Sequence, residues 1–143
     1  MLYVAVAEAG DAEMAARIRA HQQRRPPTWR TLEAPREVAV QTSRALRDGG
    51  TVLVEDLTLL LANLLPTSDA APAAEQAALA ELAALTSLPV DVILVSNEVG
   101  QGLVPAFPLG RAFRDALGRL NQAAAAAADE AYLLVAGIPL RLK

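Results

Sequence analysis

The stretch Leu2-Tyr3-Val4-Ala5-Val6-Ala7 decides the fold class, because it is a short and nearly continuous apolar run. Such a run is typical of a β-strand that is covered on both faces, as in a parallel sheet. Two further runs rich in β-branched residues follow, at 51–54 and 90–95. Because helical patterns separate the runs, the sequence predicts an α/β fold with a mainly parallel sheet and helices on both faces.

The segments between these strands carry helix signals. Asp11 is a good N-cap for a helix over 11–25, which Pro26 and Pro27 end. Pro35 opens a second helix that Gly49 and Gly50 close. The remaining expectations are an extended piece at 29–33, helices at 35–47, 57–65, 73–85 and 109–128, loops at 66–72 and 97–108, and strands at 132–135 and 140–142.

Length and composition favour a single domain and exclude several classes of site. A chain of 143 residues fits one domain, which we expect to span 1–143. The net charge of −3 argues against nucleic acid or an acidic membrane as partner. The absence of cysteine and the single histidine exclude a disulfide framework, a thiolate site and a multi-histidine zinc site. No basic-apolar leader and no apolar run of membrane length occur, so we expect a cytoplasmic protein without membrane insertion.

Polar side chains gather after each of the three predicted strands, and ligands of open parallel sheets bind at that edge. Arginines around a histidine suit phosphate, because guanidinium groups match its oxygens, and carboxylates suit Mg²⁺. The pattern therefore indicates phosphoryl or nucleotidyl transfer. The three clusters are Glu8 with Arg17, His21, Arg24 and Arg25; Glu55 with Asp56 and Thr58; and Ser96 with Asn97, Glu98 and a glycine-rich loop.

Each cluster also has a purely structural interpretation. A lone histidine on the Met14 and Ile18 face of a helix is more often a packed or exposed helix residue than a nucleophile. Arginines at the end of a helix complement its dipole, and Glu55-Asp56 is equally consistent with a solvated strand end. The pairs Arg114-Asp115 and Asn121-Gln122 are interpreted as polar surface of a helix, unless a ligand or a subunit covers them.

Several motifs resemble one known family over nearly the whole chain, in order and with matching spacing. The motifs are Arg17-Ile18-x-x-His21, Arg25-Pro26-x-x-Trp29-x-Thr31-x-Glu33, Asn63-Leu64-Leu65, Asn97-Glu98-Val99-Gly100-x-Gly102-x-Val104-Pro105, Phe113-Arg114-Asp115 and Gly118-Arg119-x-Asn121-Gln122. With these motifs the chain is similar to the bifunctional adenosylcobinamide kinase / adenosylcobinamide-phosphate guanylyltransferase family of cobalamin biosynthesis.

This resemblance implies a nucleotide-binding domain of the P-loop NTPase (RecA-like) type, assembled as a homotrimer. It implies that His21 takes up GMP from GTP and passes it to adenosylcobinamide phosphate, and that the kinase reaction uses GTP or ATP with Mg²⁺. Glu55 matches an acidic residue on the metal side of the site. The nucleotide and its phosphates are expected to contact Arg17, Arg24, Arg25, Glu33, Asn97 and Glu98.

One part of the family pattern is missing from the printed residues. The family has a strand and a phosphate loop of the form Gly-x-x-x-x-Gly-Lys-Ser/Thr ahead of the strand that begins here at Leu2. The chain has 12 arginines but one lysine, Lys143, and no such motif. We expect the first βα unit to be absent, and the loss of its N–H groups and lysine to weaken nucleotide binding.

Three interpretations remain open on sequence grounds. In the first, the coding sequence starts further upstream and the full enzyme includes the loop. In the second, the chain is a catalytically impaired relic that acts as a nucleotide- or corrinoid-binding or oligomer-forming module. In the third, it is an α/β interaction domain without a ligand, although the retention of His21, Arg25, Asn97 and Glu98 argues against this.

Overall fold

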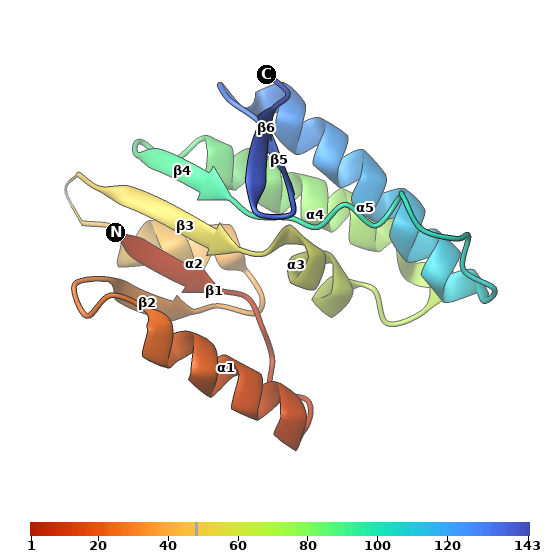
Figure 1. Cartoon of the computed structure of the whole chain (residues 1–143), viewed down its shortest axis with the longest axis horizontal. Coiled ribbons are helices and arrows are strands. Elements are labelled where there is room, and N and C mark those ends of the chain that lie inside the picture. Colours follow the sequence, from red (N-terminus) through yellow and green to blue (C-terminus); the bar gives the residue numbers. More distant parts are fainter. Residues whose placement is uncertain (48) are drawn as a thin grey trace.

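A four-stranded parallel sheet forms the centre of the computed structural model, which describes residues 1–47 and 49–143 (Figure 1). Its strands lie in the order β2 (Arg30–Glu33), β1 (Leu2–Ala5), β3 (Thr51–Glu55) and β4 (Asp91–Leu94). In this register Leu2 pairs with Arg30 on one side and with Val52 on the other. The predicted α/β class with a mainly parallel sheet is confirmed.

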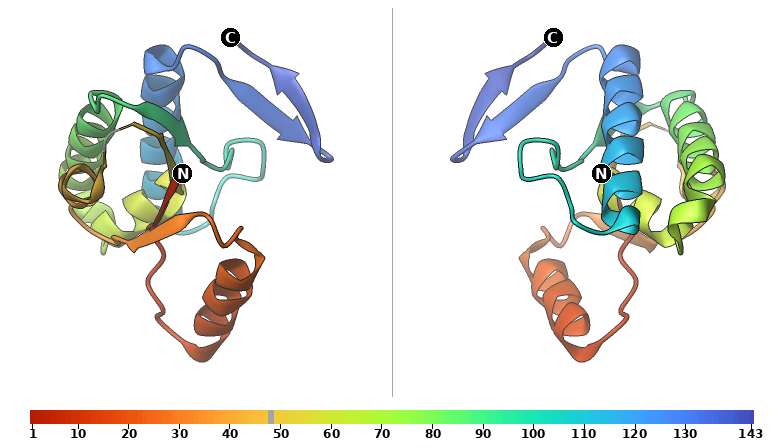
Figure 2. Two further views of the ribbon diagram at one scale, coloured as in Figure 1. Left: turned by 90° about the vertical axis from the view of Figure 1, so that its left-hand side faces the viewer. Right: turned by 90° about the vertical axis from the view of Figure 1, so that its right-hand side faces the viewer.

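Helices flank the sheet, with α1 on one side and α2 and α4 on the other (Figure 2). Asp11 caps α1 as predicted, since its side chain accepts a hydrogen bond from Met14 N. No helix among residues 1–47 and 49–143 has the length and apolar character needed to cross a membrane. The helices are α1 (Ala12–Arg24), α2 (Val38–Ala45), α3 (Leu57–Leu64), the 3-10 turn η1 (Ser68–Ala70), α4 (Ala71–Thr86) and α5 (Pro108–Ala127).

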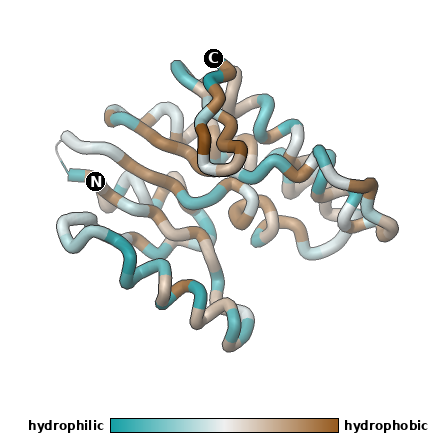
Figure 3. Tube along the Cα trace, in the orientation of Figure 1, coloured by the Kyte–Doolittle hydropathy of each residue, from teal (hydrophilic) through white to brown (hydrophobic). Residues whose placement is uncertain are grey.

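The hydrophobic core lies between one face of the sheet and the helices α2 to α5. Val4, Val52 and Val54 point to this face and are buried. The helices contribute mainly leucine, including Leu57, Leu60, Leu61, Leu85, Leu117 and Leu120. Helix α1 is different, because it has no buried residue and is largely hydrophilic along its length (Figure 3).

Helix α2 is shorter than the predicted span of 35–47. It begins at Val38 because Glu37 adopts a left-handed conformation with φ of 49°. The Glu81 carboxylate on α4 accepts a hydrogen bond from Ala39 N at 2.7 Å and so satisfies one of the free N–H groups of the first turn. A cap from a distant helix leaves no local signal, which explains the error. The predicted loop at 66–72 likewise contains η1 and the start of α4.

The last two strands form a separate antiparallel hairpin, β5 (Tyr132–Val135) and β6 (Ile138–Arg141). The strand predicted at 140–142 is present but begins earlier, at Ile138, because the connection is a two-residue turn rather than the predicted three residues 137–139. Ala136 and Gly137 have φ of 51° and 78°, as a type I′ turn requires. The hairpin exposes large apolar side chains, among them Leu134, Val135, Ile138 and Leu140.

Candidate functional site

His21 on α1 lies beside Glu55, the last residue of β3. His21 Nδ1 is 3.9 Å from Glu55 Oε1, and the two side chains are 54% and 30% exposed. The structure therefore brings a predicted nucleophile and a predicted metal-side carboxylate together at the carboxyl edge of the sheet. The other ring nitrogen, Nε2, does not face Glu55 and is available to react.

A stack of side chains on the sheet surface holds this pair. Tyr3 donates a hydrogen bond from its hydroxyl to Glu55 Oε2. The Arg25 guanidinium lies 3.7 Å from the centre of the Tyr3 ring, and Trp29 stacks on the same ring with 6.4 Å between centroids. Burial first, and then the hydrogen bond to Glu55, raise the pKa of Tyr3 to about 12. Tyr3 therefore stays protonated and keeps donating to Glu55 at neutral pH.

The other predicted residues near α1 have different surroundings. Glu33 on β2 accepts a hydrogen bond from Gln22 Nε2 at 2.8 Å, which ties the end of α1 to the sheet. Arg17 forms an exposed pair with Glu13 at 2.7 Å, one helical turn away. Arg24 is exposed at the end of α1. Glu33 therefore helps to anchor α1 to the sheet, whereas Arg17 and Arg24 face solvent.

A second polar group lies where β4 ends and α3 begins. Asn97 donates hydrogen bonds to Thr58 Oγ1 from its backbone nitrogen (3.1 Å) and from its side-chain Nδ2 (2.8 Å). Asp56 caps α3 by accepting from Leu59 N, and its other oxygen is 3.5 Å from Asn97 Nδ2. The second and third predicted clusters are therefore one connected network.

Asn121, interpreted from the sequence as polar helix surface, is half-buried and has specific partners in the segment that follows β4. Asn121 Oδ1 accepts a hydrogen bond from Ser96 Oγ at 2.6 Å, and Asn121 Nδ2 donates to the Asn97 carbonyl at 3.1 Å. These contacts join residues 24 and 25 positions apart, so the sequence does not show which partners Asn121 has. The spacing of seven residues between Arg114 and Asn121, which places both on one helix face, was the available signal.

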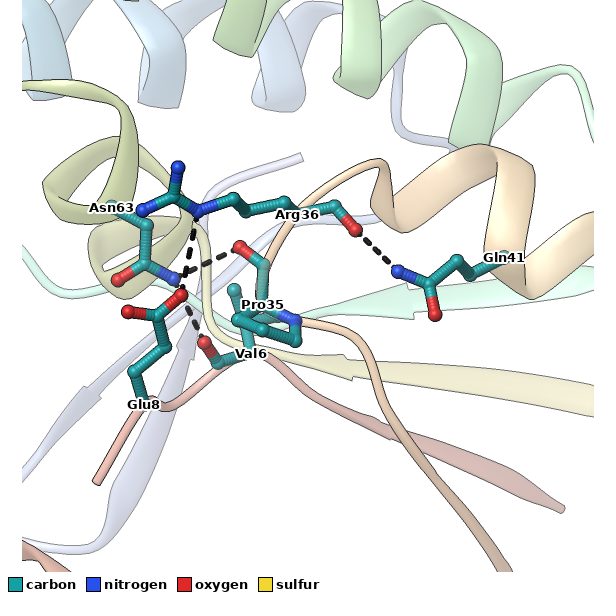
Figure 4. Close-up of polar contacts among 6 residues, drawn as sticks. All are labelled: Val6, Glu8, Pro35, Arg36, Gln41 and Asn63. Carbon is teal, nitrogen blue, oxygen red and sulfur yellow. Dashed lines mark hydrogen bonds and ion pairs between the residues drawn. The ribbon is translucent and has the colours of Figure 1, made fainter.

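Asn63 ties the ends of β1 and β2 together, which sequence analysis missed (Figure 4). Its Nδ2 donates to the carbonyls of Val6 at 2.9 Å and Pro35 at 3.0 Å. Beside it, Arg36 pairs with Glu8 at 3.4 Å (Figure 4). An asparagine inside an otherwise apolar helix was the signal, since a polar side chain there needs partners.

The donors at this edge fit a magnesium ion that arrives with a nucleotide. Within the described part of the chain, no three histidine or carboxylate side chains are grouped to hold a metal. Mg²⁺, however, is usually bound through one or two carboxylates together with substrate phosphates. Glu55 and Asp56 provide hard oxygen donors of this kind at the end of β3.

Comparison with known proteins identifies the family. The model of the family described as cobinamide kinase / cobinamide phosphate guanyltransferase matches residues 1–142. The bifunctional adenosylcobalamin biosynthesis protein CobP of Pseudomonas aeruginosa is 44% identical over 141 residues, covering 99% of this chain and 81% of the relative. The bifunctional adenosylcobalamin biosynthesis proteins CobU of Salmonella typhimurium and Escherichia coli are each 41% identical over 155 aligned positions, covering 100% of this chain and 86% of each relative.

These matches agree with the α/β architecture of the chain. The chain belongs to the cobinamide kinase / cobinamide phosphate guanyltransferase family.

Proposed function

We propose that this chain acts in cobalamin biosynthesis as an adenosylcobinamide kinase and adenosylcobinamide-phosphate guanylyltransferase, with His21 carrying GMP between GTP and the acceptor. The observation that supports this best is the placement of His21 against Glu55. With its proton on Nδ1, facing the carboxylate, the imidazole presents the Nε2 lone pair to the substrate.

In the first step, Nε2 attacks the α-phosphorus of GTP, the bond to the β-phosphate oxygen breaks, and pyrophosphate leaves. The positive charge that develops on the imidazole is stabilised by Glu55, which Tyr3 holds in place. In the second step, a phosphate oxygen of adenosylcobinamide phosphate attacks the same phosphorus. The N–P bond breaks, His21 returns to its neutral form, and adenosylcobinamide-GDP is released. A Mg²⁺ ion, which Glu55 and Asp56 would hold, would supply neutralising charge for the departing pyrophosphate when bound.

The arginines of α1 are suited to the phosphates. Arg17 and Arg24 are exposed on the helix that carries His21, and Arg25 lies at its end. Asn97 and Glu98 stand on the neighbouring turn, within the same edge of the sheet. The kinase half needs phosphate-binding N–H groups and a lysine that a Gly-x-x-x-x-Gly-Lys-Ser/Thr loop supplies in the family. We therefore propose that the 143 residues of this chain contain the groups for guanylyl transfer. Kinase activity is expected only in a protein that also contains such a phosphate loop.

The test is covalent labelling of the chain by GTP and Mg²⁺, read by intact mass and by radiolabel. GTP labelled at the α-phosphate is expected to modify the protein, and GTP labelled at the γ-phosphate is not. Because the chain has a single histidine, His21→Ala assigns the site without ambiguity. Gln23→Ala, an exposed neighbour on α1, is the matched control and keeps the label.

The linkage is expected to be acid-labile and alkali-stable, as a phosphoramidate is. The printed chain is expected to label weakly, because two lost charge-assisted hydrogen bonds of about 1.5–3 kcal/mol each weaken binding by about 10²- to 10⁴-fold. A version preceded by a family strand–loop–helix unit labels readily. If that version is not labelled, the proposal is contradicted. The relic interpretation then remains, in which the chain binds nucleotide or corrinoid without turnover.

A further inference from the structure

Two side chains of α5 hold the turn that follows β4. Arg114 donates from Nη2 to the carbonyl of Gly100 at 2.5 Å, and Asn121 donates from Nδ2 to the carbonyl of Asn97 at 3.1 Å. Residues seven positions apart lie on one face of a helix, so both contacts come from the same side of α5. The first and last residues of the turn 97–100 are therefore fixed to one helix.

The same contacts extend to the start of α3. Asn121 uses its other polar atom, Oδ1, to accept from Ser96 Oγ at 2.6 Å. Asn97 in turn donates twice to Thr58 on α3. Of these contacts, the hydrogen bond from Arg114 to Gly100 is part-buried and therefore less screened by water. One continuous chain of hydrogen bonds thus joins α5, the turn and α3.

The orientation of Glu98 depends on this turn. Glu98 Oε1 accepts a hydrogen bond from Gly100 N at 2.6 Å, and a Cβ atom added at Gly100 would lie 2.6 Å from the same oxygen. In this orientation the carboxylate occupies the space that a Cβ atom at position 100 would need. Arg114 holds the carbonyl of that same Gly100.

We propose that Asn121 and Arg114 are positioning residues for a guanine nucleotide: they keep the turn in the shape in which Asn97 and Glu98 meet the ligand. The inference rests on the proposed function, which places a nucleotide at this edge of the sheet. A turn that is ordered before binding avoids the entropy cost of ordering during binding. Loosening it is expected to weaken binding without unfolding the chain.

The test measures the Kd of GMP by calorimetry, because GMP carries the base, ribose and α-phosphate but no groups that a phosphate loop would bind. Asn121→Ala is expected to raise the Kd about tenfold, the effect of losing two hydrogen bonds of ordinary net strength. Arg114→Met raises it by about three- to tenfold, and Arg114→Lys, which keeps a donor, recovers most of the loss. Gln122→Ala, an exposed neighbour on α5, leaves it unchanged.

Hydrogen exchange of the peptide covering 95–103 is followed in the same proteins. The inference is supported when Asn121→Ala speeds exchange there, but not in β1 or β3, and weakens GMP binding. It is overturned when the Kd is unchanged, when Arg114→Lys is as weak as Arg114→Met, when exchange rises throughout the sheet, or when the parent chain does not bind GMP.

Labelling of His21 separates this inference from the proposed function. If GMP binding shows these variant effects but GTP never labels the chain, the inference is supported and the proposed guanylyl transfer is refuted. If the chain is labelled by GTP but the Asn121→Ala variant binds GMP as tightly as the parent, the guanylyl transfer is supported and the inference is refuted.

Discussion

Raising the pH above 10 is expected to destabilise the protein through one residue, Tyr3. The phenol is 5% exposed and its pKa is raised to about 12 from an ordinary 10.0, first by burial and then by the hydrogen bond to Glu55. A folded-state pKa above the unfolded value means that the stabilisation is complete below pH 10 and is lost as the pH rises through about 12. Two pKa units correspond to about 2.7 kcal/mol, half of which is lost by about pH 11.

This chain is well suited to the measurement because few other groups titrate in that range. It has no cysteine, one lysine and two tyrosines, and its arginines stay charged. The free energy of unfolding is measured by urea denaturation with circular dichroism between about pH 9 and pH 11. Absorbance of the ionised phenol, followed alongside, should show Tyr3 ionising after Tyr132, whose pKa the hydrogen bond to Glu130 also raises.

Tyr3→Phe is the decisive variant. At neutral pH it is expected to cost about 1 kcal/mol, because Glu55 loses one hydrogen bond but is exposed enough to regain water. Above pH 10 its stability should change little. Tyr132→Phe, which removes an exposed tyrosine, should keep the alkaline loss of the parent. An equal alkaline loss in Tyr3→Phe and the parent would refute the reasoning.

Three further predictions follow from contacts away from the site. Arg119 lowers the pKa of Glu75 through a two-point hydrogen bond of 2.6 and 2.7 Å, so this stabilisation is present above the unfolded pKa of about 4.5 and is lost as the pH falls through the folded value. Glu75→Gln should flatten the acid dependence of the urea midpoint and cost about 0.2–1 kcal/mol at neutral pH. Lys143 Nζ donates to the carbonyls of Ala125, Ala126 and Ala128 at the end of α5, so Lys143→Ala should lower the unfolding free energy by about 0.3–1 kcal/mol. The exposed apolar hairpin favours association, and we propose a homotrimer; light scattering that reports a monomer at micromolar concentration would contradict it.

The strands β1, β3 and β4 were predictable because each is a short and mainly apolar run. Val4, Val52 and Val54 point into the core, as expected for strands of a covered sheet. The cap at Asp11 was predictable because aspartate is a common N-cap residue. The start of α2 was not predictable, because Glu81 caps it from another helix. Nearby residues therefore determine whether a segment forms a strand or a helix. The start of α2, in contrast, depends on a contact with a residue more than 40 positions away in the sequence.

The candidate site divides in the same way. The residue types and spacing around His21 and Asn97 indicate nucleotide chemistry, and the strand ends predict that they lie at one edge. Which side chain touches which depends on how α1 and α5 lie against the sheet, and so the pairing of Tyr3 with Glu55 and the reach of Asn121 to Ser96 emerge only from the fold.

The position of His21 depends on polar and aromatic contacts rather than on burial. Helix α1 has no buried residue, and what ties its end to the sheet is the Gln22–Glu33 hydrogen bond and the guanidinium of Arg25 on Tyr3. Stacking uses the face of the guanidinium, whereas phosphate is bound by the N–H groups at its edge. Arg25 Nη1 already donates to Thr31 Oγ1 at 3.3 Å. We propose that the N–H groups of Nη2 bind a phosphate while the stack anchors the helix and fixes the plane of the guanidinium. An arginine is suited to both tasks, and a lysine, which has no flat face, is not.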